Sequence, residues 1–310
     1  MSSPVTTAKP QSGPGGVIHD IGYQRYTGPR LGRQYATRSL FVHSLRTAYG
    51  LGRSGPAKIF PWGILGLLVS IAAILVAIQS QLPPGVTDRV FTYWQFPTQT
   101  NILVLLFCAV AAPEIVSRDL RGGVLPLYFS RPLSRTDYPL AKFVALVTAV
   151  FVLLLIPLLT LFLGSAFSQE SMGAVADEFG LFLQGLVVAA LTALLFSSIA
   201  LLIASLSGRR AVAAALIVGL FILTTPVLGV VQALAWANNV DGELTGTALQ
   251  LFQLSFLVSP FTIVEGIGGW LFDADEPLVG PYGPLYLVVT FAVIAICLLL
   301  TFVRYRKVAR

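Results

Sequence analysis

Long uninterrupted apolar runs constrain this chain more than any other feature of its sequence. A helix needs about 20 apolar residues to cross the hydrocarbon core of a bilayer, and six runs approach or exceed that length. They are Ile59–Ser80, Thr100–Val116, Leu140–Ala166, Phe179–Leu206, Ala211–Ala237 and Leu285–Val303. The second run is the shortest, because Pro113 and Glu114 fall near its end. We therefore predict an all-α polytopic membrane protein with six transmembrane helices.

Composition supports lipid as the main solvent of the chain. Of its 310 residues, 55% are hydrophobic and only 11% are charged, whereas a soluble domain carries about 25% charged residues. One soluble core could not hide this much apolar surface. The net charge of +6 fits either a nucleic-acid partner or cytoplasmic loops of a membrane protein, so the positions of the charges decide.

Basic and acidic residues separate along the predicted topology. If the N-terminus is inside, all Lys and Arg except Arg89 fall on the cytoplasmic segments and their flanks. Ten acidic residues fall on the outer side: Asp88, Glu170, Asp177, Glu178, Asp241, Glu243, Glu265, Asp273, Asp275 and Glu276. The positive-inside rule then places both termini in the cytoplasm. It also accounts for the net charge with no nucleic acid.

The region before the first apolar run divides into a tail and a helix. Residues 1–33 begin with a segment rich in Ser, Thr, Pro and Gly that has no apolar signal-peptide core, so we expect a disordered cytoplasmic tail. Residues 34–58 place apolar side chains at near-helical spacing, with Arg38 and Arg46 elsewhere on the wheel. An interfacial amphipathic helix whose arginines meet anionic headgroups fits this pattern. A solvated cytoplasmic helix is the alternative.

The segment 238–284 is too long for a simple turn between the last two spans. It contains the apolar stretch "LQLFQLSFLVSPFTIVEGIGGWLF", which Pro260 and three glycines interrupt. A seventh span would put the basic C-terminus outside, against the positive-inside rule. We therefore expect a pair of re-entrant helices before the last span.

Signatures of catalysis are lacking in the sequence. Gly50, Gly52 and Gly55 match G-x-G-x-x-G, but a helix precedes them and a span follows, which is not the dinucleotide-binding context. No P-loop motif occurs, so nucleotide energy would have to come from another polypeptide. Cys108 and Cys297 each lie in an apolar run, as packing residues do. We expect no enzyme activity, no metal and no cofactor bound by this chain.

The stretch "RDLRGGVLPLYFSRPLSR", Arg118–Arg135, is the main interruption of the apolar pattern. It collects four arginines, a Gly-Gly pair and two prolines around the short apolar segment "VLPLYF". An apolar segment held outside the bilayer by flanking charges is expected to lie in a groove of a partner protein, with arginines at the rim. A basic anchor resting on lipid headgroups is the alternative.

At these residues the chain resembles a known family. "EIVSRDLRGGVLPLYFSRPLSRTDYPLAKF" is similar to the first cytoplasmic loop of ABC-2-type ABC transporter permeases, the transmembrane subunits of those transporters. "YTGPRLGRQYATRSLFVHSLRTAYGLGR" resembles the amphipathic lead-in of actinobacterial members, and "LSFLVSPFTIVEG" resembles their re-entrant segment. The resemblance implies a six-helix transmembrane domain over residues 59–310 with a coupling loop at residues 117–138.

The resemblance also implies partners and a location. It predicts a multi-pass protein of the bacterial plasma membrane, present as a homodimer or as a heterodimer with a sister permease. Two copies of a cytoplasmic ATPase would bind and hydrolyse ATP with Mg. Residues 118–132 would sit in a groove of the ATPase, and the contact residues we expect are Asp119, Leu120, Arg121, Leu125, Tyr128 and Arg131.

Two further sets of residues are candidates within the spans. Ala211, Ala215 and Gly219 form a small-residue stripe, which suits either the dimer contact or packing within one subunit. A second, polar set is a candidate for the translocation path: Asn101, Thr224 and Thr225. The apolar lining favours a lipophilic or amphiphilic cargo, and the resemblance implies export of that cargo. An ATP-independent carrier or channel, or a non-transporting membrane scaffold, is the alternative function.

Overall fold

The computed structural model describes residue 28 and residues 31–81, 92–130, 133–169, 171–237, 244–272 and 278–308. By their internal contacts, residues 32–310 belong to a single structural unit. Its described residues are helical, with no strand among them. Six helical segments are long and apolar enough to cross a membrane: Pro56–Gln79, Asn101–Arg121, Asp137–Ala166, Met172–Leu206, Arg210–Ala237 and Gly280–Lys307. The prediction of an all-α protein with six spans is confirmed.

Several helices are longer than the predicted apolar runs, and the added residues include polar ones. The second span consists of α5 (Asn101–Ile115) and α6 (Ser117–Arg121), so it continues into the coupling loop. The fourth span, α9 (Met172–Leu206), starts well before Phe179. The hydroxyl of Ser171 caps it by accepting a hydrogen bond from the backbone N–H of Ala174 at 3.2 Å. A cap residue therefore fixes the helix start, and the apolar window alone does not reveal it.

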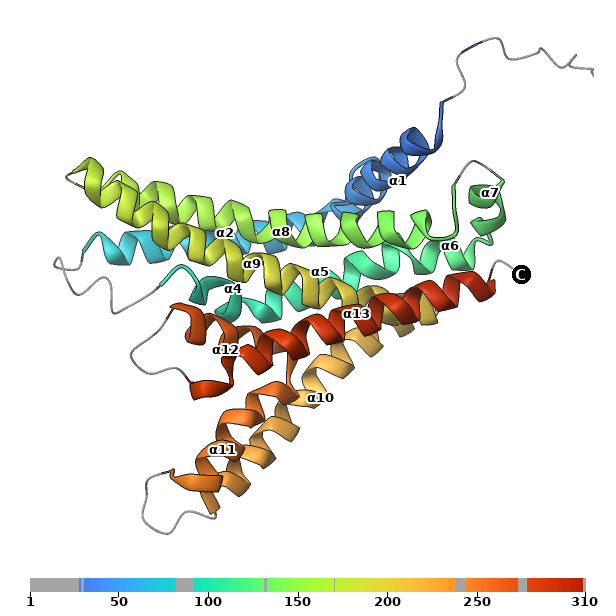
Figure 1. Ribbon diagram of the computed structural model, residues 1–310. Coiled ribbons are helices and arrows are strands. Elements are labelled where there is room, and N and C mark those ends of the chain that lie inside the picture. The colour runs from blue at the N-terminus through green and yellow to red at the C-terminus, as the bar shows by residue number, and fades with distance from the viewer. Residues whose placement is uncertain are drawn as a thin grey trace, which may run out of the picture. The chain divides into compact units, whose positions relative to one another are not determined.

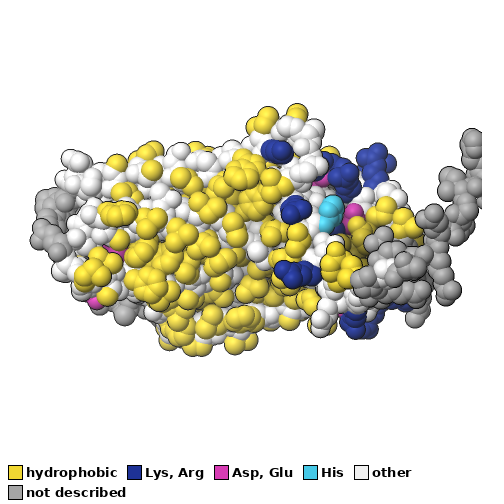
Figure 2. All heavy atoms as spheres, turned by 90° about the horizontal axis from the view of Figure 1, so that it is seen from above, with side chains coloured by type: hydrophobic (Ala, Val, Ile, Leu, Met, Phe, Trp, Pro, Cys, Tyr) yellow, Lys and Arg dark blue, Asp and Glu magenta, His cyan; other side chains and the backbone are white. Residues whose placement is uncertain are grey.

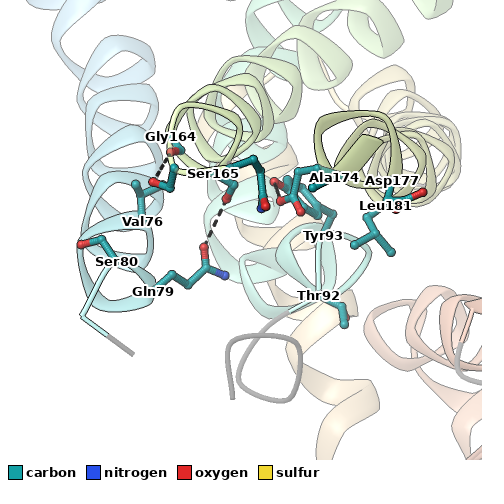
Figure 3. Close-up of a pocket in the computed structure, with 13 residues that line it drawn as sticks. Val76, Gln79, Ser80, Thr92, Tyr93, Gly164, Ser165, Ala174, Asp177 and Leu181 are labelled. Carbon is teal, nitrogen blue, oxygen red and sulfur yellow. Dashed lines mark hydrogen bonds between the residues drawn. The ribbon is translucent and has the colours of Figure 1, made fainter. Parts of the chain in front are cut away.

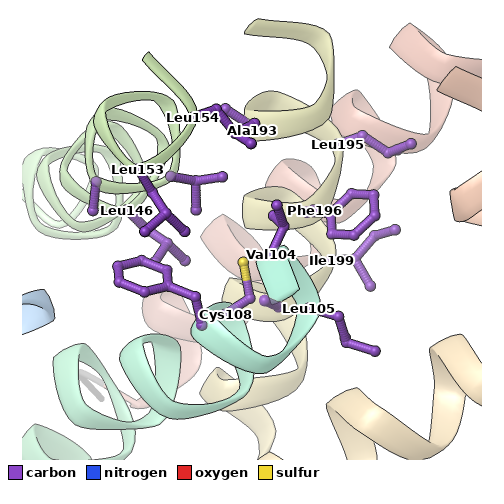
Figure 4. Packing of buried hydrophobic residues seen from close by; sticks show 14 of the residues in the cluster. Val104, Leu105, Cys108, Leu146, Leu153, Leu154, Ala193, Leu195, Phe196 and Ile199 are labelled. Carbon is purple, nitrogen blue, oxygen red and sulfur yellow. The ribbon is translucent and has the colours of Figure 1, made fainter. Parts of the chain in front are cut away.

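Helix α9 lies at the centre of the bundle. It packs against α5, α8 (Asp137–Ala166), α10 (Arg210–Ala237) and α13 (Gly283–Val308). Figure 4 shows Cys108 of α5 among Leu146 and Leu153 of α8 and Phe196 of α9, and all four side chains are buried. Close van der Waals packing of this kind holds helices together in lipid, where the hydrophobic effect between spans is weak.

Helix α1 (Arg33–Ala48) ends earlier than the helix expected over residues 34–58. The chain turns at Gly50, whose φ of 67° favours glycine, and a Cβ at that position would collide with the carbonyl of Ala57. Helix α2 (Pro56–Gln79) then begins the first span. The phenol of Tyr49 donates a hydrogen bond to the carbonyl of Ala149 at 2.7 Å, which fixes the turn on α8. Gly50 thus serves a tight turn.

The long segment before the last span forms two short helices with a sharp bend. Helix α11 (Gly246–Ser255) and the 3-10 turn Phe256–Val258 lead to α12 (Pro260–Phe272), and the two parts differ in direction by 120°. Figure 1 shows α11 beside α10, while α12 turns back toward α13. This is the shape that the re-entrant prediction requires.

Charge is distributed unevenly over the surface. Figure 2 shows Lys and Arg side chains gathered at one end and an apolar belt over the rest of the visible face. In Figure 1 the same end carries α6, α7 (Leu125–Phe129) and the C-terminal part of α13. Two contacts confirm this grouping: the Ser117 hydroxyl donates to the carbonyl of Ala204 at 2.9 Å, and Arg304 donates to the carbonyl of Ser205. We call this end the basic end.

Candidate functional site

The coupling loop lies at the basic end as two short helical turns. Helix α6 continues from α5, and Gly123, with a φ of 61°, turns the chain into α7. The Ser117 hydroxyl bonds to α9, so the start of the loop is fixed to the centre of the bundle. The loop is therefore anchored where it leaves the membrane span.

A buried ion pair holds the base of the loop. The Nζ atom of Lys142, on α8, lies 2.9 Å from Oδ2 of Asp119 and donates to the carbonyl of Ile115 at 2.9 Å. The phenol of Tyr138 donates to the same Asp119 oxygen at 2.8 Å. The side chain of Lys142 is only 3% exposed. A charge this deeply buried is stable only when its partners satisfy it, as they do here.

Sequence reasoning missed Lys142 as a site residue, although a signal was present. Lys142 is the one ionisable residue within the predicted third run, Leu140–Ala166. A charge within a span calls for a partner, because burial of an unpaired charge is costly. That signal predicts a partner but does not identify Asp119, which lies on another helix.

Three tyrosine rings continue the contact from the loop into the bundle. The ring centroid of Tyr128, on α7, lies 5.5 Å from that of Tyr138, which lies 5.1 Å from that of Tyr305 on α13. Tilted rings at such distances attract one another beyond their burial alone. Tyr138 is fully buried at the centre of this row. The row therefore connects α7 to α8 and α13.

Glu114 joins three parts of the basic end. Its Oε2 lies 2.6 Å from Nη1 of Arg53, in the turn before α2, and its Oε1 accepts from Arg210 at the start of α10. The side chain of Glu114 is mostly buried, whereas both arginines reach solvent. One carboxylate thus links the first span, the second span and α10.

The start of α1 is tied to the end of the coupling loop by a forked ion pair. Arg33 donates from Nε and Nη2 to the two carboxylate oxygens of Asp137, each at 2.6 Å. The hydrogen bond and the charge of Asp137 raise the pKa of the Arg33 guanidinium. Because Arg33 is largely exposed, this pair adds little stability. Its role is to fix the direction of α1 relative to α8.

The predicted ATPase contacts divide into inward and outward side chains. Leu125 is only 5% exposed, Asp119 is ion-paired, and Leu120 and Tyr128 are half-buried. Arg121 is exposed, and Arg131 lies outside the described residues. Leu127, which sequence reasoning did not select, is 68% exposed. In this conformation, therefore, α7 exposes Leu127 and packs Leu125 against its own chain.

Two of the three polar candidates for the translocation path meet at the bend between α11 and α12. The Thr224 hydroxyl donates to Oγ of Ser259 at 3.0 Å, and Nδ2 of Asn101 donates to the carbonyl of Phe261 at 3.2 Å. Oδ1 of Asn101 is buried and has no partner among the described residues. Thr225 is exposed on the other side of α10. The bend thus gathers polar groups from α5, α10 and α12.

The small-residue stripe is not used for packing between the described helices. Ala211 and Ala215 are exposed, and a Cβ built on Gly219 would have no neighbour within 4 Å. Of the six spans, α10 has the smallest fraction of its apolar window buried within the described chain. In this conformation the stripe is therefore open, and its use in helix packing stays a prediction.

A polar cavity of about 510 Å³ lies at the end opposite to the coupling loop. Figure 3 shows it between α2, α8 and α9, with Gln79, Tyr93 and Asp177 among its lining residues. The Tyr93 phenol donates to Glu178, and burial together with that carboxylate raises the pKa of Tyr93. Sequence reasoning did not select these residues, because they lie in three separate segments without a shared motif.

Comparison with known proteins agrees with this geometry. The family model described as "ABC-2 family transporter protein" matches residues 24–309, nearly the whole chain. No match is found among the curated proteins.

Proposed function

The chain belongs to the ABC-2 transporter family, and we propose on that premise that its coupling loop receives the stroke of a separate ATPase. The chain is a multi-pass permease subunit of an ABC transporter, and the family as a whole works with an ABC ATPase. The observation that carries the proposal is the asymmetry of the loop. Its base is clamped by Asp119 and Lys142, while Arg121 and Leu127 face outward.

A loop that transmits motion to the spans must be held firmly at its base. A loop that moved freely relative to the spans would absorb the motion of its partner. Here α6 is bonded to α9 through Ser117 and to α8 through Lys142, and the row of tyrosines extends the contact to α13. Closure of the ATPase pair would then rock these helices together between two states that nucleotide binding biases.

The dimer contact of this proposal runs along α10. A stripe of Ala211, Ala215 and Gly219 permits close approach of two helices in lipid, and it is open in the single chain. Two permease subunits paired in this way carry two ATPase subunits. The stripe fits a second copy of this chain as well as a sister permease, so both the homodimer and the heterodimer agree with it.

We infer the chemical class of the cargo from the side chains on α10 and at the bend between α11 and α12. Exposed side chains along α10 are mostly aliphatic, and the polar groups near the bend are the uncharged Asn101, Thr224 and Ser259. Such a surface favours a lipophilic or amphiphilic cargo, since a strongly charged cargo would lack counter-charges there, and the direction we propose, export, rests on the family resemblance.

Co-purification of the chain with its ATPase tests this function. Leu127→Asp combined with Arg121→Glu is expected to abolish the association, because it inverts the chemistry of the outward face without touching the clamped base. Arg209→Glu, an exposed arginine at the basic end outside the loop, is the matched control and should retain the ATPase. Ion-driven transport by the chain alone in liposomes would instead support the carrier or channel.

A further inference from the structure

A second cavity, of about 810 Å³, lies at the basic end beside the coupling loop. It is bordered by α1, the turn before α2, the junction of α5 and α6, α7 and α8. Its charged and titratable lining residues are His43, Arg46, Arg53, Glu114, Arg118, Asp119, Tyr128 and Lys142. We call it the basic cavity. Arg121 and the predicted path at the bend do not line it, and it shares Leu127 with the exposed face of α7.

Positive charge is in excess within the basic cavity. Its two carboxylates are both taken: Glu114 pairs with Arg53 and with Arg210, and Asp119 pairs with Lys142. The guanidinium groups of Arg46 and Arg118 have neither an ion-pair nor a side-chain hydrogen-bond partner within the described part of the chain. The guanidinium groups of two arginines on two different helices therefore line one cavity. This arrangement fits a phosphate group, which accepts paired hydrogen bonds from arginine.

The surroundings of the cavity favour a lipid as the source of that phosphate. Ile115 and Lys142, at its floor, belong to the ends of membrane spans, and the turn carrying Leu51 leads directly into α2. The headgroup layer of the cytoplasmic leaflet lies at this depth in the predicted topology. Leu51 and Val124 also line the cavity, which gives an acyl chain an apolar contact that free phosphate would not need.

We propose that the basic cavity binds the phosphate group of an anionic phospholipid from the cytoplasmic leaflet, with Arg46 and Arg118 as its ligands. The bound headgroup bridges α1 to α6 and so covers the inner side of the coupling loop. Binding itself does not depend on the proposed role of the loop. Its consequence for the loop rests on the proposed function.

Native mass spectrometry of the full-length chain in mild detergent tests the site. The probes are phosphatidylglycerol and phosphatidylcholine with the same acyl chains. We expect the unmodified chain to retain phosphatidylglycerol in preference. Because each arginine near an anionic lipid contributes roughly fivefold to binding, Arg46→Gln with Arg118→Gln should reduce retention of phosphatidylglycerol about tenfold or more and leave phosphatidylcholine unchanged.

A matched pair of arginines controls for net charge. Arg209 and Arg306 are exposed at the same end and do not line the cavity, so Arg209→Gln with Arg306→Gln should change retention less than about twofold. Equal losses in the two double variants would overturn the proposal, as would full retention after loss of Arg46 and Arg118. Thermal unfolding of each variant shows whether a loss of lipid reflects a loss of fold.

Two further arms distinguish the source of the ligand. Inorganic phosphate added at increasing concentration should leave the phosphatidylglycerol in place, and its complete displacement would assign the cavity to a free anion. Addition of the ATPase should also leave the lipid bound; its expulsion would assign the cavity to the partner protein. A variant that loses the lipid but still co-purifies with the ATPase agrees with both the lipid site and the proposed function. Lipid retention therefore tests the site, and co-purification tests the function.

Discussion

The ammonium group of Lys142 lies 2.9 Å from the carboxylate of Asp119, across the gap between α8 and α6. One residue belongs to a membrane span and the other to the start of the coupling loop. Since Lys142 also donates to the carbonyl of Ile115, the pair fixes both the side chain and the backbone at the point where the loop begins. The loop therefore moves with the bundle.

Loss of Lys142 should destabilise the protein strongly. In Lys142→Met the methionine fills a similar volume but leaves the partly buried Asp119 without its cation, and breaking a fully buried pair on one side costs about 3–5 kcal/mol, which sets the upper end of the expected loss. The buried thiols of Cys108 and Cys297 provide the assay, because a thiol-reactive dye labels them only as the chain unfolds. We expect a clearly lower midpoint than for the unmodified chain.

The double variant Lys142→Met with Asp119→Asn separates charge from packing. It removes both charges and keeps an acceptor for the Tyr138 phenol, so part of the lost stability should return. If the double variant unfolds as early as the single one, packing around Lys142 explains the loss and the ion pair does not.

Glu114→Gln should loosen the basic end. An amide cannot neutralise Arg53 and Arg210, so two cations lose their common partner; such losses cost about 1–3 kcal/mol. Asp177→Asn, an exposed acid at the other end of the bundle without an ion pair among the described residues, is the control and should unfold like the parent. A midpoint for Glu114→Gln equal to that of the control would contradict the structural role of this carboxylate.

Gly268→Val should disturb the packing of α12 on Trp94. A Cβ at Gly268 would lie 2.6 Å from Cε3 of the Trp94 ring, and overpacking of this kind costs about 1–3 kcal/mol. Tryptophan fluorescence should shift together with the unfolding midpoint. An unchanged midpoint would mean that α12 is not seated against Trp94 in the membrane.

Gly219→Leu should leave the fold of the single chain intact but weaken the dimer. A Cβ there meets nothing within 4 Å in the single chain, and leucine is a much better helix former than glycine, which is about 0.8–1.0 kcal/mol less favourable than alanine in a helix, so the fold should be unharmed. Close approach of a second α10 would be blocked, and the dimer fraction in detergent should fall. Leu220→Ala, at an exposed position on a different face of the same helix, serves as control. A dimer fraction that survives Gly219→Leu would move the contact away from this stripe.

The sequence predicts the spans well because a bilayer imposes one strong requirement, a long apolar helix, on each of them. It predicts their ends less well. Ser171 starts α9 by a local hydrogen bond, and Gly50 ends the lead-in by a turn, neither of which changes the apolar pattern. Both signals are single residues, whereas the spans are signalled by some twenty residues each.

Within the coupling loop, sequence identifies the segment but not its exposed side chains. Leu125 and Leu127 have the same chemistry, and only the packing of the loop against the bundle buries the first and exposes the second. The same holds for Lys142, whose need of a partner is readable from its place in an apolar run, while the identity of that partner depends on how α6 meets α8. Contacts between helices distant in sequence decide both cases.

Site-specific photo-crosslinking in intact cells tests the coupling account most directly. A photoreactive amino acid replaces Leu127 in one variant and Phe167, which is 89% exposed beyond the other end of α8, in another. Mass spectrometry identifies the captured proteins. The account predicts that the variant at residue 127 captures a P-loop ATPase and that the variant at residue 167 does not. Capture of the ATPase at residue 167 alone, or at neither position in cells that transport, would contradict it.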